Sequence, residues 1–235
     1  MKTVTNILLI VAFFALSAQA DELNKEAVID KMIEVYGGEA LLTQVSSYDQ
    51  VWAIDRKVGS KEGIDYRQVT LPDYLNTQLV YDDKSETRTL IKDKGIKVTN
   101  GTKIEPKGPM LDAMKLQLMR LYSPIVLKNK IKDITLSTSD LEYELSLPKG
   151  TILTTYFVSK KSFLIEKVIG KLTMGDQSME FKTLYQNYRK VNGLMLANTE
   201  VKYAAEINTA IMTLKDMRLP PKKSNQTTET NTTTE

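Results

Sequence analysis

The sequence contains no cysteine and no histidine among its 235 residues. Without them, no Ser-His-Asp or Cys-His nucleophile can form, and no zinc, haem or iron–sulfur site with the usual ligands is possible. A carboxylate-pair glycosidase or an oxygen-ligand metal site passes this test. The acidic residues, however, occur singly and mostly beside lysines, as on a solvated face. The sequence therefore disfavours an enzyme, and we expect no cofactor and no metal site.

An excess of charge of one sign is also missing. The formal net charge is +3, from 32 basic and 29 acidic side chains that are spread evenly along the chain. This balance implies neither nucleic acid nor an anionic membrane surface as a partner. The apolar run at residues 7–16 is about half as long as the roughly 20 residues that a membrane-spanning helix needs.

The two ends of the chain differ in composition from its centre. Lys2, the apolar run and the small residues Ala18-Gln19-Ala20 follow one another in the order of a secretory signal peptide. We expect residues 1–20 to be cleaved off after Ala20, and the protein to be periplasmic. Residues 220–235 are rich in Thr and Asn and offer no apolar surface to bury, which predicts a disordered tail. One domain is expected in between, over residues 21–219.

A first helix is predicted near the start of this domain. Ile29, Met32, Ile33 and Tyr36 lie at i, i+3, i+4 and i+7, which places them on one face. Two glycines follow and end the helix. Residues 39–44 are expected to form one more short helical turn.

A second helix is predicted in the middle of the chain, beginning at Pro109 and ended by Pro124. Its apolar positions recur at helical spacing: Leu111, Met114, Leu118, Leu121 and Tyr122. Several of the surrounding residues are methionines, whose flexible side chains adapt to varied apolar ligands but also fill ordinary cores.

The rest of the domain alternates with the period of two that is typical of strands. In residues 46–55, Tyr48, Gln50, Trp52 and Ile54 share one face. In residues 63–71, Ile64, Tyr66 and Gln68 share one face, and we expect this face to point into the apolar interior. Turn residues separate about nine or ten strands in unbroken succession, which predicts an antiparallel meander. The expected further strands are 74–81, 87–92, 142–147, 151–158, 164–174, 178–188, 194–203 and 207–217.

This pattern predicts a mostly β fold of the α+β class, with a curved antiparallel sheet that short helices cover. A sheet of this size curls, and one apolar face becomes concave. The two predicted helices are too short to fill that concave face completely. We therefore expect an apolar cavity under a helical lid, in which an acyl chain gains about 0.8 kcal/mol per buried CH₂ group.

Several segments resemble periplasmic outer-membrane lipoprotein-sorting proteins, the relatives of the lipoprotein carrier LolA. These segments follow the family's order from residue 24 to 218: Val28-Ile29-Asp30-Lys31-Met32-Ile33-Glu34-Val35-Tyr36-Gly37-Gly38 with Val45-Ser46-Ser47, Leu71-Pro72-Asp73-Tyr74, Tyr143-Glu144-Leu145-Ser146-Leu147, residues 156–167, and Tyr185-Gln186-Asn187-Tyr188 with residues 189–196. The resemblance implies a LolA-like half-barrel whose cavity holds acyl chains. The chain has Ala197 where proline is common in the family, and Leu71 where a basic residue is common. No latch residue is therefore carried over.

These observations favour a soluble periplasmic carrier or chaperone that binds acylated lipoproteins or lipids for outer-membrane sorting. It would act as a monomer and exchange cargo with membrane transport components of the envelope. The alternative is an envelope protein-interaction module on the same fold, a stress sensor or accessory subunit that transfers no lipid. The candidate cavity lining consists of apolar-face positions: Trp52, Ile54, Tyr66, Leu79, Tyr81, Leu111, Met114, Leu118, Tyr143, Leu145, Tyr156 and Val168.

Overall fold

The computed structural model of the chain describes residues 23–219. The predicted signal peptide and the predicted C-terminal tail lie outside the described residues. Within these residues, one antiparallel sheet of 13 strands contains every strand, in the order β6-β5-β4-β3-β2-β1-β13-β12-β11-β10-β9-β8-β7. The first and last strands of the chain, β1 and β13, pair at the centre of the sheet, so the sheet consists of two meanders joined along that pair.

The strands vary from three to 15 residues in length. Their bounds are β1 Ser47–Arg56, β2 Lys61–Thr70, β3 Tyr74–Tyr81, β4 Lys84–Ile91, β5 Lys94–Thr99, β6 Thr102–Ile104, β7 Thr135–Thr138, β8 Glu142–Lys149, β9 Ile152–Ser159, β10 Ile165–Met174, β11 Gln177–Val191, β12 Leu194–Ala204 and β13 Ile207–Arg218. Strand β5 and the two edge strands, β6 and β7, are not among the predicted strands. The edge strands are too short to display an alternating pattern.

The helices are α1 Lys25–Tyr36, α2 Glu39–Gln44, α3 Pro109–Met119 and α4 Pro124–Asn129, followed by a single 3₁₀ turn, η1 Ile131–Asp133. The predictions for α1 and α2 are confirmed. The predicted helix between Pro109 and Pro124 is confirmed over residues 109–119 and is wrong over residues 120–123, because α3 ends at Met119 and Pro124 begins a new helix. A proline at a first helical position loses no hydrogen bond, so it starts a helix as readily as it ends one.

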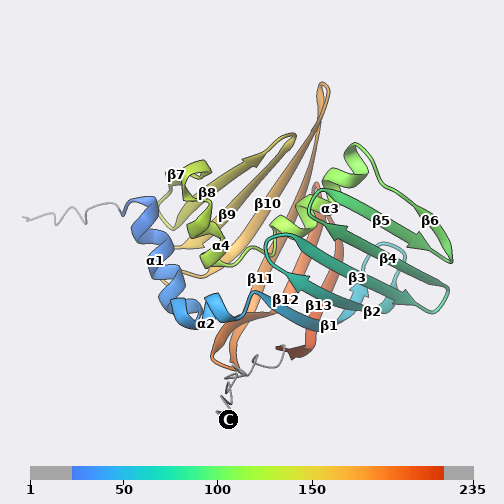
Figure 1. Cartoon of the computed structure of the whole chain (residues 1–235), viewed down its shortest axis with the longest axis horizontal. Coiled ribbons are helices and arrows are strands. Elements are labelled where there is room, and N and C mark those ends of the chain that lie inside the picture. Colours follow the sequence, from blue (N-terminus) through green and yellow to red (C-terminus); the bar gives the residue numbers. More distant parts are fainter. Residues whose placement is uncertain (1–22, 220–235) are drawn as a thin grey trace, which may run out of the picture.

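The segment that joins β6 to β7 crosses the concave face of the sheet. Because these strands are opposite edges, residues 105–134 connect the two ends of the curved sheet, and α3 and α4 lie between those ends (Figure 1). Helix α3 contacts β9 and β10 on one side and β4 and β5 on the other, and α1 contacts α4. The sheet is therefore an open half-barrel with helices against its hollow side.

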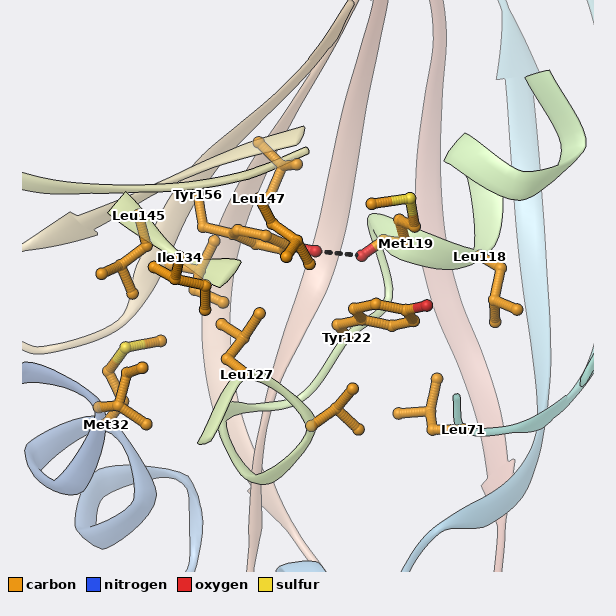
Figure 2. Packing of buried hydrophobic residues seen from close by; sticks show 14 of the residues in the cluster. Met32, Leu71, Leu118, Met119, Tyr122, Leu127, Ile134, Leu145, Leu147 and Tyr156 are labelled. Atoms are coloured by element: carbon orange, nitrogen blue, oxygen red, sulfur yellow. Dashed lines mark hydrogen bonds between the residues drawn. The ribbon is translucent and has the colours of Figure 1, made fainter. Parts of the chain in front are cut away.

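The main core lies where these helices meet β8, β9 and β10 (Figure 2). Buried positions recur at every second residue of β8 and β9, and in β10 this pattern is interrupted by a bulge at residues 165–167. Helix α1 buries Val28, Ile29, Met32 and Ile33 in the same apolar cluster. Packing is close enough that a Cβ atom on Gly170 of β10 would lie only 2.2 Å from a methyl group of Leu116 in α3. Glycine at this position lets α3 approach the sheet.

Strand β2 reverses the predicted assignment of its faces. Its concave side carries Asp65, Arg67 and Val69, all buried, whereas Tyr66 lies on the outer side and is 42% exposed. The prediction that Tyr66 faces inward is wrong. Hydrophobic alternation assigns charged residues to the solvent face, but the buried charges here neutralise one another.

Candidate binding site

An apolar cavity of about 130 Å³ lies on the concave face beside the ends of α1, α2 and α3. Its floor is formed by β1, β12 and β13, including Trp52, Leu196 and Met217. Its cover is the linker between α3 and α4, Arg120 to Ser123, together with Leu42 of α2. The cavity thus lies at the place where the helical connection crosses the sheet.

Three tyrosine hydroxyl groups fix the cover of this apolar cavity. Tyr156 of β9 donates a hydrogen bond to the Met119 carbonyl oxygen at 2.6 Å, which is the dashed line in Figure 2. Tyr185 of β11 donates to the Arg120 carbonyl at 2.9 Å, and Tyr122 donates to the Pro72 carbonyl at 3.4 Å. The last carbonyl groups of a helix lack partners within the helix, so the bonds to Met119 and Arg120 satisfy them and hold the end of α3 to the sheet.

Two further tyrosines border the opposite side of the apolar cavity. The hydroxyl groups of Tyr36 in α1 and Tyr188 in β11 lie 3.2 Å apart, and their rings pack edge to face. The backbone N–H of Ile165 donates to Tyr36, and Tyr188 donates to the Ile165 carbonyl. Burial raises the pKa of Tyr36 to about 12. Both rings therefore stay neutral and present apolar edges to the cavity.

A buried ion cluster lies between β2 and β12, next to the apolar cavity. The guanidinium of Arg67 forms two parallel hydrogen bonds with the Glu200 carboxylate, at 2.9 and 3.0 Å, and a third with Asp65 at 2.6 Å. The side-chain ammonium of Lys202 lies 3.2 Å from Glu200. The bidentate geometry is the strong form of the Arg–carboxylate pair, and it offsets the desolvation of both groups.

The electrostatics of this cluster follow from burial opposed by pairing. Burial alone raises the pKa of Glu200, but the charges of Arg67 and Lys202 outweigh it and lower that pKa to about 2. For Lys202, burial lowers the pKa to about 8, and Glu200 offsets only part of the effect. The Arg67 guanidinium also lies 4.8 Å from the ring centre of Trp52, so the cluster adjoins the floor of the apolar cavity.

A second cavity, of about 230 Å³, lies on the other side of the ion cluster, under α3. We call it the charged cavity, because the side chains of Asp65, Arg88, Arg120 and Lys202 line it together with apolar residues. A narrow gap of about 10 Å³ between Arg120 and Glu200 separates it from the apolar cavity. Arg120 lines all three spaces.

The structure distributes the twelve predicted lining residues over four places. Trp52 lines the apolar cavity; Ile54, Leu79 and Tyr81 line the charged cavity; Tyr66 lies outside. The remaining seven belong to the packed core: Leu111, Met114, Leu118, Tyr143, Leu145, Tyr156 and Val168. Periodicity identified inward-facing positions correctly in these cases, but it does not distinguish a residue beside a cavity from one in a filled core.

Sequence reasoning missed the polar residues of the site. Arg120, Glu200 and Lys202 come from one helix end and one strand, and nothing in their spacing connects them. A local signal was available for β12, where Glu200 and Lys202 lie on one face of a strand that is otherwise expected to be half apolar. Their partner Arg67 is 133 residues away from Glu200, so only the fold brings them together.

The described part of the chain also limits other kinds of site. Residues 23–219 contain no cluster of three or more acidic side chains that could hold a metal ion. None of the helices in the same range is long and apolar enough to cross a membrane. The concave face is the candidate site because it holds the apolar cavity and the charged cavity.

The fold matches that of an outer membrane lipoprotein-sorting protein domain from Vibrio parahaemolyticus, with a TM-score of 0.50 and 9% sequence identity over 85% of this chain and 94% of that one. A DUF1329 family protein from Desulfovibrio piger gives a TM-score of 0.48 at 11% identity, covering 85% of this chain and 94% of its own. A LolA superfamily protein from Nitrosomonas europaea gives 0.48 at 13% identity, covering 84% and 94%. No protein-family model and no curated protein matches the chain. The likeness to the Vibrio domain confirms the predicted half-barrel as the fold.

Proposed function

We propose that this protein is a periplasmic carrier that binds the acyl chains of lipoproteins or lipids on the concave face of its sheet. The observation that carries the proposal is the apolar cavity beneath the α3–α4 linker. An open half-barrel offers apolar volume on one side, and a short helical connection covers it. On this proposal the role is one of binding, with no chemical step.

The size of the cavity supports a carrier that opens to load its cargo. A cavity of about 150 Å³ holds one benzene molecule, so the 130 Å³ present here takes only part of an acyl chain. The cover is attached to the sheet through the tyrosine hydrogen bonds to Met119, Arg120 and Pro72 and through the packing of Leu121 and Tyr122 against the core. Each such bond contributes about 1 kcal/mol, which the burial of two CH₂ groups exceeds. A long acyl chain can therefore displace the cover.

The fold match gives the proposal its cargo class. The Vibrio domain is named for outer-membrane lipoprotein sorting, and the same arrangement of sheet and helices serves here to enclose apolar volume. The predicted export signal would place this protein in the compartment between two membranes. A carrier in that compartment must shield acyl chains from water, and the apolar cavity offers such a surface.

The test is whether the mature chain takes up acyl lipids. We would purify residues 21–235 from a periplasmic extract, extract it with solvent and identify bound species by mass spectrometry. Uptake of a fluorescent fatty acid by the delipidated protein would be measured in parallel. We expect co-purifying acyl lipid and saturable uptake. A lipid-free protein that takes up no probe would contradict the carrier function and favour the protein-interaction module.

A pair of matched substitutions locates the uptake. Leu196→Trp adds an indole ring to the wall of the apolar cavity, so uptake should fall at least about tenfold. Leu153→Trp makes the same change on the outer face of β9, where Leu153 is 38% exposed, and should leave uptake unchanged. Melting temperatures close to that of the parent would show that both variants are folded. Equal uptake by both variants would mean that the apolar cavity is not the site.

A further inference from the structure

The charges around the charged cavity do not balance. Arg88 pairs with Glu86, Lys202 pairs with Glu200, and Asp65 pairs with Arg67. Arg120 forms no ion pair within 4 Å anywhere in residues 23–219, and its side chain makes one hydrogen bond, to the Thr183 hydroxyl at 3.3 Å. Among the four basic residues Arg67, Arg88, Arg120 and Lys202, Arg120 is therefore the one without an ion pair in the described part of the chain, although Glu200 lies across the gap from it.

Arg120 is also held in place. Its backbone carbonyl accepts the hydrogen bond from Tyr185, and its backbone N–H donates to the Leu116 carbonyl at 3.0 Å. The side chain is half-buried, so its charge is only partly screened by water. A guanidinium has five N–H donors in a planar fork that matches an oxyanion, and the Thr183 contact uses one of them.

The surroundings of Arg120 combine this positive charge with apolar surface. In the charged cavity its cationic neighbours are Arg88 and Lys202, and Asp65 is the single acidic lining residue. Leu79, Ala113 and Phe181 form apolar parts of the same wall. Toward the other side, Arg120 lines the apolar cavity itself and the gap of about 10 Å³ beside it, which is about the size of one water molecule.

We infer that Arg120, assisted by Lys202, binds the anionic head group of an amphiphile whose acyl chain lies in the neighbouring apolar cavity. This inference rests on the proposed function, and it adds the substrate class: the ligand carries a carboxylate or a phosphate, and a neutral acyl compound binds less tightly. The oxyanion accepts hydrogen bonds from the Arg120 guanidinium, and its negative charge forms the ion pair that Arg120 lacks. Burial lowers the pKa of Arg120, because removal from water disfavours the charged form of the guanidinium.

The experiment compares two probes that differ only in charge. Binding of cis-parinaric acid and of its methyl ester to the delipidated mature chain is followed by their fluorescence at pH 7. The parent should bind the acid at least about tenfold more tightly than the ester. In Arg120→Gln, the dissociation constant for the acid should rise about tenfold, and that for the ester should stay the same. Arg120→Lys keeps the charge and should retain part of the preference.

Arg189→Gln is the matched control, because Arg189 is exposed on β11 and lines none of the three spaces. Its dissociation constants should equal those of the parent. If parent and Arg120→Gln prefer the acid equally, or if the parent binds both probes equally, the anion site is wrong and the carrier function still stands. If neither probe binds the parent, the carrier function itself is wrong. Near-parental melting temperatures establish that Arg120→Gln and Arg120→Lys are folded.

A competition assay separates the two sources of the anion. Dodecanoate, dodecyl phosphate and dodecanol displace the bound parinaric acid from the parent. Stronger displacement by dodecyl phosphate identifies a phosphate head group, and stronger displacement by dodecanoate identifies a carboxylate. Equal displacement by both anions, with dodecanol at least about tenfold weaker, means that the site recognises a negative charge and does not distinguish a carboxylate from a phosphate. Dodecanol that competes as well as both anions would overturn the inference.

Discussion

Two regions of the same concave face bury different kinds of side chain. In β8, β9 and β10, inward positions are almost all apolar, and α1, α3 and α4 pack against them. In β1, β2 and β12, inward positions include Gln50, Asp65, Arg67 and Glu200, and a smaller apolar cluster around Trp52 lies beside them. The first region is a filled core, whereas the second adjoins both the apolar cavity and the charged cavity.

The difference separates stability from binding. Apolar burial stabilises the fold by roughly 25 cal/mol per Å² and needs no particular partner. Buried charges stabilise little in total, and each depends on its partner. A region built from buried charges can distinguish charged from neutral ligands, but it contributes less to the free energy of unfolding than an apolar region. We therefore expect substitutions in the two regions to differ in kind, and the predictions below test that difference.

The largest effect is expected from breaking the ion cluster at its centre. Arg67→Leu leaves Glu200 and Asp65 buried without their main partner, which should lower the free energy of unfolding by about 3–5 kcal/mol. Urea denaturation measures this change. Adding Asp65→Leu, Glu200→Leu and Lys202→Leu to the same chain removes the remaining charges of the cluster and should restore most of the lost stability. A loss below about 1 kcal/mol for Arg67→Leu alone would show that the cluster is not a coupled unit.

The second-largest effect is a loss of folding stability at low pH. The pKa of Glu200 in the folded protein, about 2, is lower than its ordinary value of 4.5, so the group stabilises the fold above pH 4.5 and loses that contribution as the pH falls toward 2. The loss should amount to roughly 3 kcal/mol. Glu200→Gln should lack this part of the acid sensitivity. Urea titrations from pH 5 to pH 2 on both chains measure it, and identical pH profiles would contradict it.

A smaller effect is expected in the filled core. Tyr156→Phe removes the donor to the buried Met119 carbonyl, which should cost about 1–3 kcal/mol of stability. The preference for an anionic over a neutral probe should not change, because Tyr156 lines neither cavity. Tyr203→Phe serves as control, since within residues 23–219 the Tyr203 hydroxyl has no hydrogen bond. A changed probe preference in Tyr156→Phe would show that core and binding region are not separate.

Alternation and turn residues were sufficient to predict most of the fold. In β1, Gln50, Trp52 and Ile54 face inward as predicted, because they occupy every second position of the strand and therefore share one face. Helix α1 follows from its stripe and its terminal glycines. Where charges are buried, the same rule fails. From the sequence alone, Asp65 and Arg67 are assigned to the solvent face of β2. They are buried because the fold places Glu200 next to Arg67.

The binding site was less predictable than the fold. Leu145 and Trp52 have the same local signature, an apolar residue on the inward face of a strand, yet Leu145 lies in a filled core and Trp52 beside a cavity. The difference depends on where α3 ends and the linker to α4 begins. Sequence periodicity predicts a helix that extends to Tyr122, so the linker that covers the apolar cavity could not be recognised from the sequence.

Photolabelling of the delipidated mature chain tests the carrier role and the division of the concave face together. The probe is the methyl ester of a long-chain fatty acid with a diazirine near the end of its chain, and the labelled peptides are identified by mass spectrometry. We predict saturable labelling of the peptides that contain Trp52, Leu121 and Leu196, which surround the apolar cavity. Labelling confined to β8 and β9 or to the outer face at Tyr66, or no saturable labelling at all, would contradict the account.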